Sequence, residues 1–234
     1  MSFEERNVAE AMGPQELLAR CVPQIMARHE QAWLVGGWVR DRLRGELTHD
    51  IDFVVPAGAV ATARFLADWL GGAFVLLDEE RDTARVLVGP SWEATYLDLA
   101  GLRAPRIEDD LLERDFTVNA MAVPASDWQG PHLSVIDPTG GRRDLERGLL
   151  RAVSSESYRA DPLRLMRAVR LSGSLGLELE KDSRVWAQRD AALLATVAHE
   201  RVRDELVQIV DLAGAERWCR LLEDLGLLAV ILPE

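Results

Sequence analysis

The spacing of apolar and polar residues divides the chain into a mixed α/β part and a helical part. Short apolar runs typical of strands cover 32–35, 51–55, 74–77, 84–88 and 95–99. Apolar residues recur at helical spacing over 14–31 with an interruption at Pro23, 39–43, 59–70, 161–174, 182–194, 199–212 and 215–226. Because every segment after about residue 155 has the helical pattern, we expect an α/β head at 1–154 and an all-helical neck at 155–234.

Two carboxylates lie on the expected strand at 51–55. A strand directs alternate side chains to one face, so Asp50 and Asp52 should point the same way while Ile51 and Phe53 face the core. Two like charges at that distance are tolerable when a divalent cation lies between them. Such a pair can hold Mg²⁺ around a nucleoside triphosphate, and Asp98 is the candidate for a third carboxylate on a neighbouring strand. Taken alone, Asp-x-Asp is more often a solvent-facing strand start.

A glycine pair precedes the carboxylates. Gly36 and Gly37 join a strand to a helix, where backbone N–H groups can approach a phosphate. Arg40, one turn into that helix, could neutralise a triphosphate. A glycine pair by itself is usually only a turn. The order Gly-Gly, Arg, Asp-x-Asp within seventeen residues is much more specific.

A row of arginines follows the start of the helical part. Asp161 and Pro162 are typical of a helix start, with Asp as N-cap and Pro at the first helical position. Arg164, Arg167 and Arg170 recur every three residues and form a stripe on one helix face. Two interpretations stay open at this point: a capped helix with a solvated basic face, or a binding surface.

Composition narrows the class of protein. No apolar stretch of about 18 residues occurs, so no membrane span is expected. The acidic start at Met1–Glu5 lacks an apolar signal region, which favours a cytoplasmic protein. Cys21 and Cys219 have no metal-binding context and are expected to be ordinary buried thiols. With a net charge of −12, RNA contacts have to come from a local arginine cluster or from parts absent from this chain.

Beyond these features, the sequence resembles the class II tRNA nucleotidyltransferase and bacterial poly(A) polymerase family. Segments similar to the family's motifs occur in order as LVGGWVRDRLRG with HDIDFVV, Glu108–Ala122, Asp137–Leu145, Asp161–Arg170 and Glu200–Leu206. The resemblance implies a polymerase-β-like nucleotidyltransferase head with a mixed sheet and helices, followed by a helical neck. It also implies that the family's body and tail are absent.

The resemblance implies a role for each motif residue. Asp50 and Asp52 would bind magnesium, and Asp98 falls where the family carries its third acidic residue, which makes these three the expected catalytic set. The expected nucleotide-binding residues are Gly36, Gly37, Arg40, Arg114, Asn119, Asp161, Arg164, Arg167 and Arg170. The implied partners are the tRNA 3′ end and CTP, with ATP as a further candidate. The oligomeric state stays open.

Hydrogen-bonding chemistry explains how the implied residues would choose a base. The Asp161 carboxylate only accepts hydrogen bonds and the Arg164 guanidinium only donates them. Cytosine and adenine each present an amine donor beside a ring acceptor, which matches this pair. Uracil and guanine present the opposite order and would leave buried polar groups unpaired, at about 1–3 kcal/mol per group.

Two departures from the family pattern bear on specificity. Ala160 stands where an acidic residue is common, which puts the support of the base-selecting helix in doubt. Only Leu99–Ile107 separate the strand at Asp98 from the motif at Glu108, where CCA-adding members usually carry a long flexible loop. Members with a short loop tend to add CC, so CC addition is expected here. Full CCA addition, A addition and poly(A) synthesis stay open.

Two further classes of function compete with this prediction. A non-catalytic nucleotide- or RNA-binding module derived from the same fold would fit the acidic charge and the missing body. The intact Asp50, Asp52, Arg40 and Arg114 argue against it. A nucleotidyltransferase that modifies a protein or a small molecule would explain the carboxylates but not the helix from Asp161 to Arg170.

Overall fold

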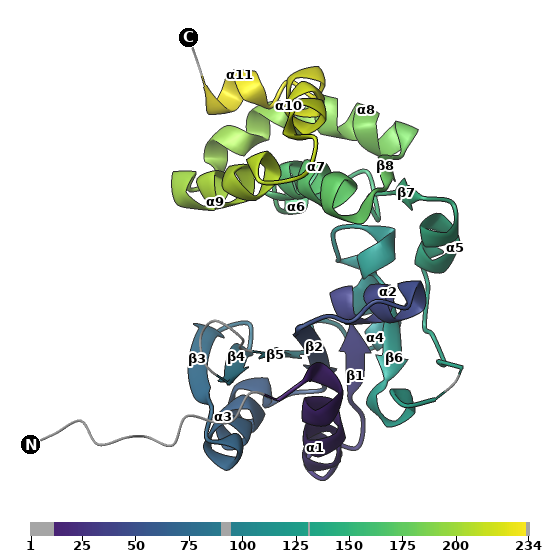
Figure 1. The fold of residues 1–234 in the computed structure, drawn as a ribbon, viewed down its shortest axis with the longest axis vertical. Helices are drawn as coiled ribbons and strands as arrows, with labels where there is room; N and C mark the ends of the chain where they lie inside the picture. Colours follow the sequence, from purple (N-terminus) through teal and green to yellow (C-terminus); the bar gives the residue numbers. More distant parts are fainter. Residues whose placement is uncertain (1–11, 90–94, 131, 233–234) are drawn as a thin grey trace, which may run out of the picture. The chain divides into compact units, whose positions relative to one another are not determined.

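A mixed six-stranded sheet organises the first part of the chain (Figure 1). The computed structural model describes residues 12–89, 95–130 and 132–232. The strands lie in the order β3-β4-β5-β2-β1-β6. Within this sheet β2 pairs with β5 in parallel, whereas the other described pairs are antiparallel. The prediction of a mixed sheet accompanied by helices is therefore confirmed.

The elements of the first part agree closely with the apolar pattern. Its strands are β1 Trp33–Val35, β2 Asp50–Val55, β3 Ala73–Asp78, β4 Thr83–Val88, β5 Thr95–Gly101 and β6 Ala122–Pro124. Its helices are α1 Pro14–Met26, α2 Gly37–Arg44, α3 Ala59–Leu70, α4 Ile107–Leu112 and the 3₁₀ turn η2 Ala125–Asp127. Helix α3 packs against β3, β4 and β5, and α1 lies beside it.

The later part is mostly helical. Its helices are η1 Thr117–Asn119, α5 Gly141–Glu146, α6 Ser157–Ala160, α7 Arg164–Leu175, α8 Lys181–Asp190, η3 Ala191–Thr196, α9 His199–Val210, α10 Ala215–Asp224 and α11 Leu228–Ile231. Helix α7 contacts both α9 and α10. Two short strands, β7 Leu149–Leu150 and β8 Glu178–Leu179, pair in parallel.

The chain forms two compact units that interleave in sequence. The sheet unit comprises Met1–Leu111 and Met121–Asp137, and the helical unit comprises Leu112–Ala120 and Pro138–Glu234. Each unit has its own apolar core. The segment 112–120, which contains part of the second motif, therefore packs with the helices. The division of the chain into a head at 1–154 and a neck at 155–234 stays a prediction.

The strands of the sheet bury alternate side chains, as their sequence pattern requires. In β4, Ala84 and Val86 are buried while Arg85 between them is half-exposed. In β5, Leu97 and Leu99 are buried while Asp98 is half-exposed. Period-two alternation of this kind produces one apolar face and one polar face. The polar face is the one that carries the carboxylates.

Several sequence predictions about the elements are wrong, and one of them is the interruption at Pro23, which lies inside α1. Helix α1 ends at Met26, five residues before the predicted end, because the N–H groups of Arg28 and His29 both turn back to the carbonyl of Ile25. The stretch after residue 155 is not wholly helical, because α7 ends at Leu175, Gly176 follows it with a φ of 67°, and the chain then continues into β8. Two-residue strands leave too little periodicity to be recognised.

A glutamate cap should make a measurable contribution to the helical unit. The Glu180 carboxylate accepts a hydrogen bond from the N–H of Ser183 at 3.0 Å, so it caps α8. We predict that Glu180→Ala lowers the free energy of unfolding by about 1 kcal/mol in urea denaturation. Glu178→Ala, which removes an exposed glutamate two residues earlier, is the control and should change stability by much less. Equal effects of the two substitutions would contradict the assignment of the cap.

Candidate active site

The carboxylates of the sheet unit lie on the polar face at its parallel strand pair. In β2, Ile51 and Phe53 are buried at 0% and 1% exposure, whereas Asp50 is exposed and Asp52 is half-exposed. Asp52 is directly opposite Asp98 of β5 in the parallel register. The expectation that alternate positions share a face is thus met. Three carboxylates gather on two neighbouring strands.

An arginine that the sequence prediction missed contacts the third carboxylate. Arg85 of β4 is opposite Asp98 in the antiparallel register. Its Nε donates to Asp98 Oδ1 at 2.7 Å and its Nη2 donates to Oδ2 at 2.8 Å. The hydrogen bond to Asp98, with the negative charges of Asp50 and Asp52 nearby, raises the pKa of Arg85 despite its partial burial. The sequence signal for Arg85 was a charged residue between the apolar residues of an expected strand. The sequence did not show which residue of the neighbouring strand it would face.

The donor chemistry of Asp50 and Asp52 fits a hard divalent cation, because Mg²⁺ is commonly held by one or two carboxylates together with phosphates. Within the residues that the structure describes, no group of three or more His, Cys, Asp or Glu side chains could hold a metal ion. Asp98, the expected third carboxylate, has both of its oxygens hydrogen-bonded to Arg85. Asp50 and Asp52 therefore stay the predicted metal ligands on this face.

The glycine pair adopts a backbone that favours glycine. Gly36 has φ 66° and ψ −131° and precedes the first residue of α2, and its N–H donates to the carbonyl of Met121 at 3.3 Å. Arg40 folds back over the start of the helix, where a Cβ on Gly37 would meet Arg40 Nη2 at 3.4 Å. The Arg40 guanidinium also binds Asp41, with Nε 2.7 Å from Oδ1. A glycine at position 37 therefore leaves room for this arginine.

In the helical unit, a buried ion pair organises the segment around the second motif. Asp115 accepts hydrogen bonds from Arg167 Nε at 3.0 Å, from the N–H of Phe116 at 2.8 Å and from Asn119 Nδ2 at 3.2 Å. Burial alone would raise the pKa of Asp115, but the Arg167 charge and these hydrogen bonds hold the pKa below its ordinary value. Asn119 thus orders this segment through Asp115.

Arg164 links α7 to the same segment through backbone carbonyls. Its Nη2 donates to the carbonyl of Glu113 at 2.8 Å, and its Nη1 donates to those of Arg114 at 3.2 Å and Ser157 at 3.3 Å. Arg114 itself is half-exposed. The predicted nucleotide-binding residues Arg114, Asn119, Arg164 and Arg167 are thus brought together in one unit.

Asp161 begins the chain segment that leads into α7. The helix starts at Arg164, because Pro162 and Leu163 form a turn instead of its first residues, so the predicted helix start at Asp161 is wrong by three residues. Asp161 Oδ1 nevertheless accepts a hydrogen bond from the N–H of Leu163 at 3.1 Å. Its Oδ2 lies 3.7 Å from Arg201 Nη2 of α9.

The arginine stripe of α7 is not a solvated face. Arg170 Nε donates to Glu205 Oε2 of α9 at 2.6 Å, and both side chains are largely buried. Each of the three predicted arginines therefore has a different internal partner. Glu205 of α9 thus pairs with Arg170 of α7, and Arg201 of α9 lies beside Asp161 in the segment before α7.

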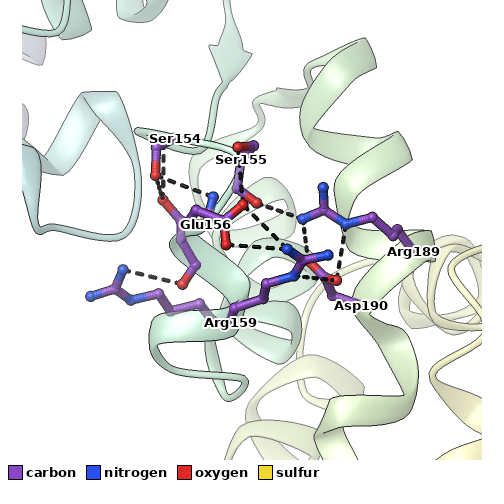
Figure 2. Close-up of polar contacts among 8 residues, drawn as sticks. Ser154, Ser155, Glu156, Arg159, Arg189 and Asp190 are labelled. Atoms are coloured by element: carbon purple, nitrogen blue, oxygen red, sulfur yellow. Dashed lines mark hydrogen bonds and ion pairs between the residues drawn. The ribbon is translucent and has the colours of Figure 1, made fainter.

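A second network fixes the chain just before Asp161 (Figure 2). Arg159 of α6 and Arg189 of α8 both donate through Nε to Asp190 Oδ1 at 3.0 Å. Arg189 Nη2 also donates to the carbonyl of Ser155 at 2.6 Å. The hydrogen bond from Arg189, reinforced by Arg159, lowers the pKa of Asp190 against the effect of burial. This network ties α6 to the end of α8, which supports the segment that carries Asp161.

The remaining candidates are unremarkable in their surroundings. Cys21 is buried, and burial raises the pKa of its thiol to about 12. Cys219 is only half-buried, so the expectation that both thiols are buried is wrong for this one. His49, which precedes Asp50, is exposed.

Among the described helices, none combines the length and apolar character required to cross a membrane.

The fold and the polar face together define a class of protein. A mixed sheet with an Asp-x-Asp pair beside a Gly-Gly turn, followed by helices, is the arrangement of a polymerase-β-like nucleotidyltransferase. Residues 32–151 match the family model of the poly A polymerase head domain. Residues 176–234 match a model described as a probable RNA- and SrmB-binding site of polymerase A. The match to the head-domain model covers more than half of the chain. The chain therefore belongs to the poly A polymerase family.

The relatives within this family are enzymes that add nucleotides to tRNA. The chain is 42% identical over 192 residues to the CC-adding tRNA nucleotidyltransferase of Geobacter sulfurreducens, a match that covers 81% of this chain and 43% of that protein. It is 45% identical over 208 residues to the A-adding tRNA nucleotidyltransferase of Deinococcus radiodurans, covering 87% and 45% respectively. The chain thus spans about half the length of the curated relatives it matches.

Solved structures show the same architecture. A CCA-adding enzyme in an apo form superimposes with a TM-score of 0.79 at 27% identity, covering 96% of this chain and 54% of that one. The Thermotoga maritima CCA-adding enzyme complexed with tRNA superimposes with a TM-score of 0.78 at 26% identity, covering 95% and 56%. The predicted family and fold class are therefore confirmed.

The buried pair of Asp115 and Arg167 yields a test of stability. We predict that Asp115→Asn lowers the free energy of unfolding at pH 7 by about 3 kcal/mol, because it leaves the Arg167 charge without its buried partner. The folded-state pKa of Asp115 lies below its unfolded value of about 3.9. The contribution of the ion pair is therefore complete above that pH and is lost as pH falls through the folded-state pKa.

Urea unfolding of wild type and variant at several pH values checks this prediction. The difference in stability should be greatest near pH 7 and should shrink as the pH falls below about 4. Asp204→Asn serves as the control, because Asp204 pairs with Arg203 at the surface, where such a pair contributes little. A stability difference for Asp115→Asn that is independent of pH would contradict the ionic origin of the effect.

Proposed function

We propose that the protein is a metal-dependent nucleotidyltransferase that adds CMP from CTP to the 3′ end of tRNA and releases pyrophosphate. The observation that carries this proposal is the pair of Asp50 and Asp52 on one face of β2, one strand away from the Gly36-Gly37 turn. Similarity to CC-adding and A-adding tRNA nucleotidyltransferases supports the choice of substrate. Relatives solved with tRNA or CTP support both partners.

Asp50 and Asp52 would hold Mg²⁺, which supplies activation of the attacking hydroxyl and stabilisation of the leaving pyrophosphate when bound. The turn at Gly36 and Gly37 would receive the triphosphate at the start of α2, where backbone N–H groups point outward. Arg40 would neutralise phosphate charge, exchanging part of its contact with Asp41 for the nucleotide. Asp98 completes the carboxylate set on β5.

The incoming base would be chosen in the helical unit. Asp161 would accept a hydrogen bond from the exocyclic amine, and Arg164 would donate to the ring acceptor beside it. Arg164 and Arg167 both bind the segment that contains Arg114 and Asn119. The nucleotide-contacting residues would therefore respond together when CTP binds. Arg170 would act by holding α7 against α9 through Glu205.

The substitution of Ala160 for an acidic residue does not leave this region unsupported. Arg159, which precedes Ala160, and Arg189 both donate hydrogen bonds to Asp190 (Figure 2). Arg201 lies beside Asp161 on the other flank. We infer that these arginine contacts support the segment at which an acidic residue is common in the family.

CC addition is the favoured specificity because the connection between β5 and α4 is short and a hydrogen bond holds it to α4. The strand ends at Gly101 and α4 begins at Ile107, and the N–H of Arg103 donates to Asp110 Oδ1 at 3.2 Å. A long flexible loop at this place is what the switch from C to A is expected to need. A addition is the second candidate, because the A-adding relative from Deinococcus radiodurans is 45% identical.

Single-nucleotide extension in the presence of Mg²⁺ tests this proposal. tRNA transcripts that end at the discriminator base, at C and at CC are each offered CTP, ATP, GTP or UTP separately. We predict CMP addition to the first two transcripts and no AMP addition to the third. AMP on the CC end would favour A or CCA addition, and no transfer to any transcript would contradict the catalytic proposal in favour of a binding module.

Two substitutions separate catalysis from base choice. Asp52→Ala should abolish transfer of every nucleotide, because it removes half of the metal-binding pair. Arg164→Ala should relax discrimination against UTP and GTP by about 1–3 kcal/mol while some CMP transfer persists. Arg220→Ala is the matched control, since Arg220 is exposed and pairs only locally with Glu216 among the contacts described. Equal loss of all transfer in Arg164→Ala would contradict a role in base choice.

A further inference from the structure

Arg85 engages both oxygens of Asp98, the carboxylate that stands beside the metal-binding pair. Nε and Nη2 form a two-pronged contact with Oδ1 and Oδ2 at 2.7 and 2.8 Å. A fork of this kind occupies the outward-facing lone pairs of a carboxylate and fixes its orientation. Partners that hydrogen-bond a metal-binding carboxylate orient it for the metal. Here the guanidinium takes one lone pair of each oxygen and places its positive charge beside both of them.

The contact lies in a row across three strands of the sheet. Arg85 of β4 is opposite Asp98 of β5, and Asp98 is opposite Asp52 of β2. All three positions belong to the polar face, where alternate residues are half-exposed. A cation that used Asp52 and Asp98 together would therefore lie next to a guanidinium of the same charge sign, which is unfavourable.

Arg85 has a second neighbour on this face. Its guanidinium carbon lies 5.0 Å from the ring centroid of Tyr96, and Tyr96 is opposite Asp50 in the parallel register. An aromatic ring of this kind attracts a guanidinium at a similar distance. The guanidinium can therefore leave Asp98 without entering the apolar core, because the ring remains available to it at the surface.

We propose that Arg85 competes with the metal ion for Asp98, so that Asp98 becomes a metal ligand only when Arg85 releases it. While the two side chains are paired, Arg85 acts as the counter-charge of the third carboxylate. Arg85 is accordingly a positioning residue that acts through Asp98. This inference rests on the proposed function, because it assumes that the face of Asp50 and Asp52 binds a divalent cation.

Mn²⁺ binding to the full 234-residue chain tests the inference without reference to activity. Free Mn²⁺ is followed by its electron paramagnetic resonance signal during titration, in the absence of nucleotide. The proteins compared are wild type, Arg85→Gln, Asp98→Asn and the double variant, which form a double-mutant cycle. Glutamine keeps a hydrogen-bond donor near Asp98 but removes the charge. Arg85→Lys keeps the charge and should bind Mn²⁺ as wild type does.

We predict that Arg85→Gln binds Mn²⁺ about tenfold more tightly than wild type, because the competing charge has gone. The gain should disappear in the Asp98→Asn background, because the carboxylate that Arg85 releases is absent there. Unchanged or weaker binding in Arg85→Gln would overturn the inference and would leave Arg85 as a fixed support of Asp98. A gain that persists in the Asp98→Asn background would also overturn it, since a general charge effect would then suffice.

Two controls separate this inference from the proposed function. Arg81→Gln removes the same charge from an arginine that is 72% exposed and pairs with Asp78, and it should not change Mn²⁺ affinity. Asp52→Asn should lose Mn²⁺ binding whatever residue is present at position 85. If Asp52-dependent binding is found without the gain in Arg85→Gln, only the inference fails. If no variant binds Mn²⁺, the metal dependence in the proposed function fails as well.

Discussion

The parallel pairing of β2 with β5 is the constraint on which the proposed chemistry depends. It sets Asp52 directly opposite Asp98, while the alternation within β2 keeps Asp50 on the same face and sends Ile51 and Phe53 into the core. A shift by one residue would bury the carboxylates and expose the apolar side chains. The burial of the apolar residues of β2 and β5 in one core with α3 therefore fixes the register of the carboxylates as well.

In the helical unit, arginines bind carboxylates and backbone carbonyls, although the net charge of the protein is −12. Arg164 binds backbone carbonyls, Arg167 binds the buried Asp115, and Arg170 binds Glu205. Each arginine thus already serves a structural contact. Nucleotide binding to this surface would have to exchange or share such contacts, as it would at Arg85 in the sheet unit.

Much of this arrangement could be predicted from residue patterns. Period-two alternation around Asp50 and Asp52 gave the strand and its polar face, because burial acts on alternate positions. The partner of Asp98 could not be foreseen, because the register of β4 against β5 is settled by tertiary packing. Similarly, Asp115 and Arg167 are far apart in sequence, and only the folded helical unit brings their charges together.

Crystals of the protein grown with CTP and Mn²⁺ give the most direct test of the central claim, that Asp50 and Asp52 form the metal site of a nucleotidyltransferase. Anomalous scattering from Mn²⁺ locates the ion independently of any assumption about the site. We predict an anomalous peak within coordination distance of carboxylate oxygens of both residues and next to the triphosphate. A peak elsewhere, or well-defined CTP with no Mn²⁺ at these carboxylates, would contradict it.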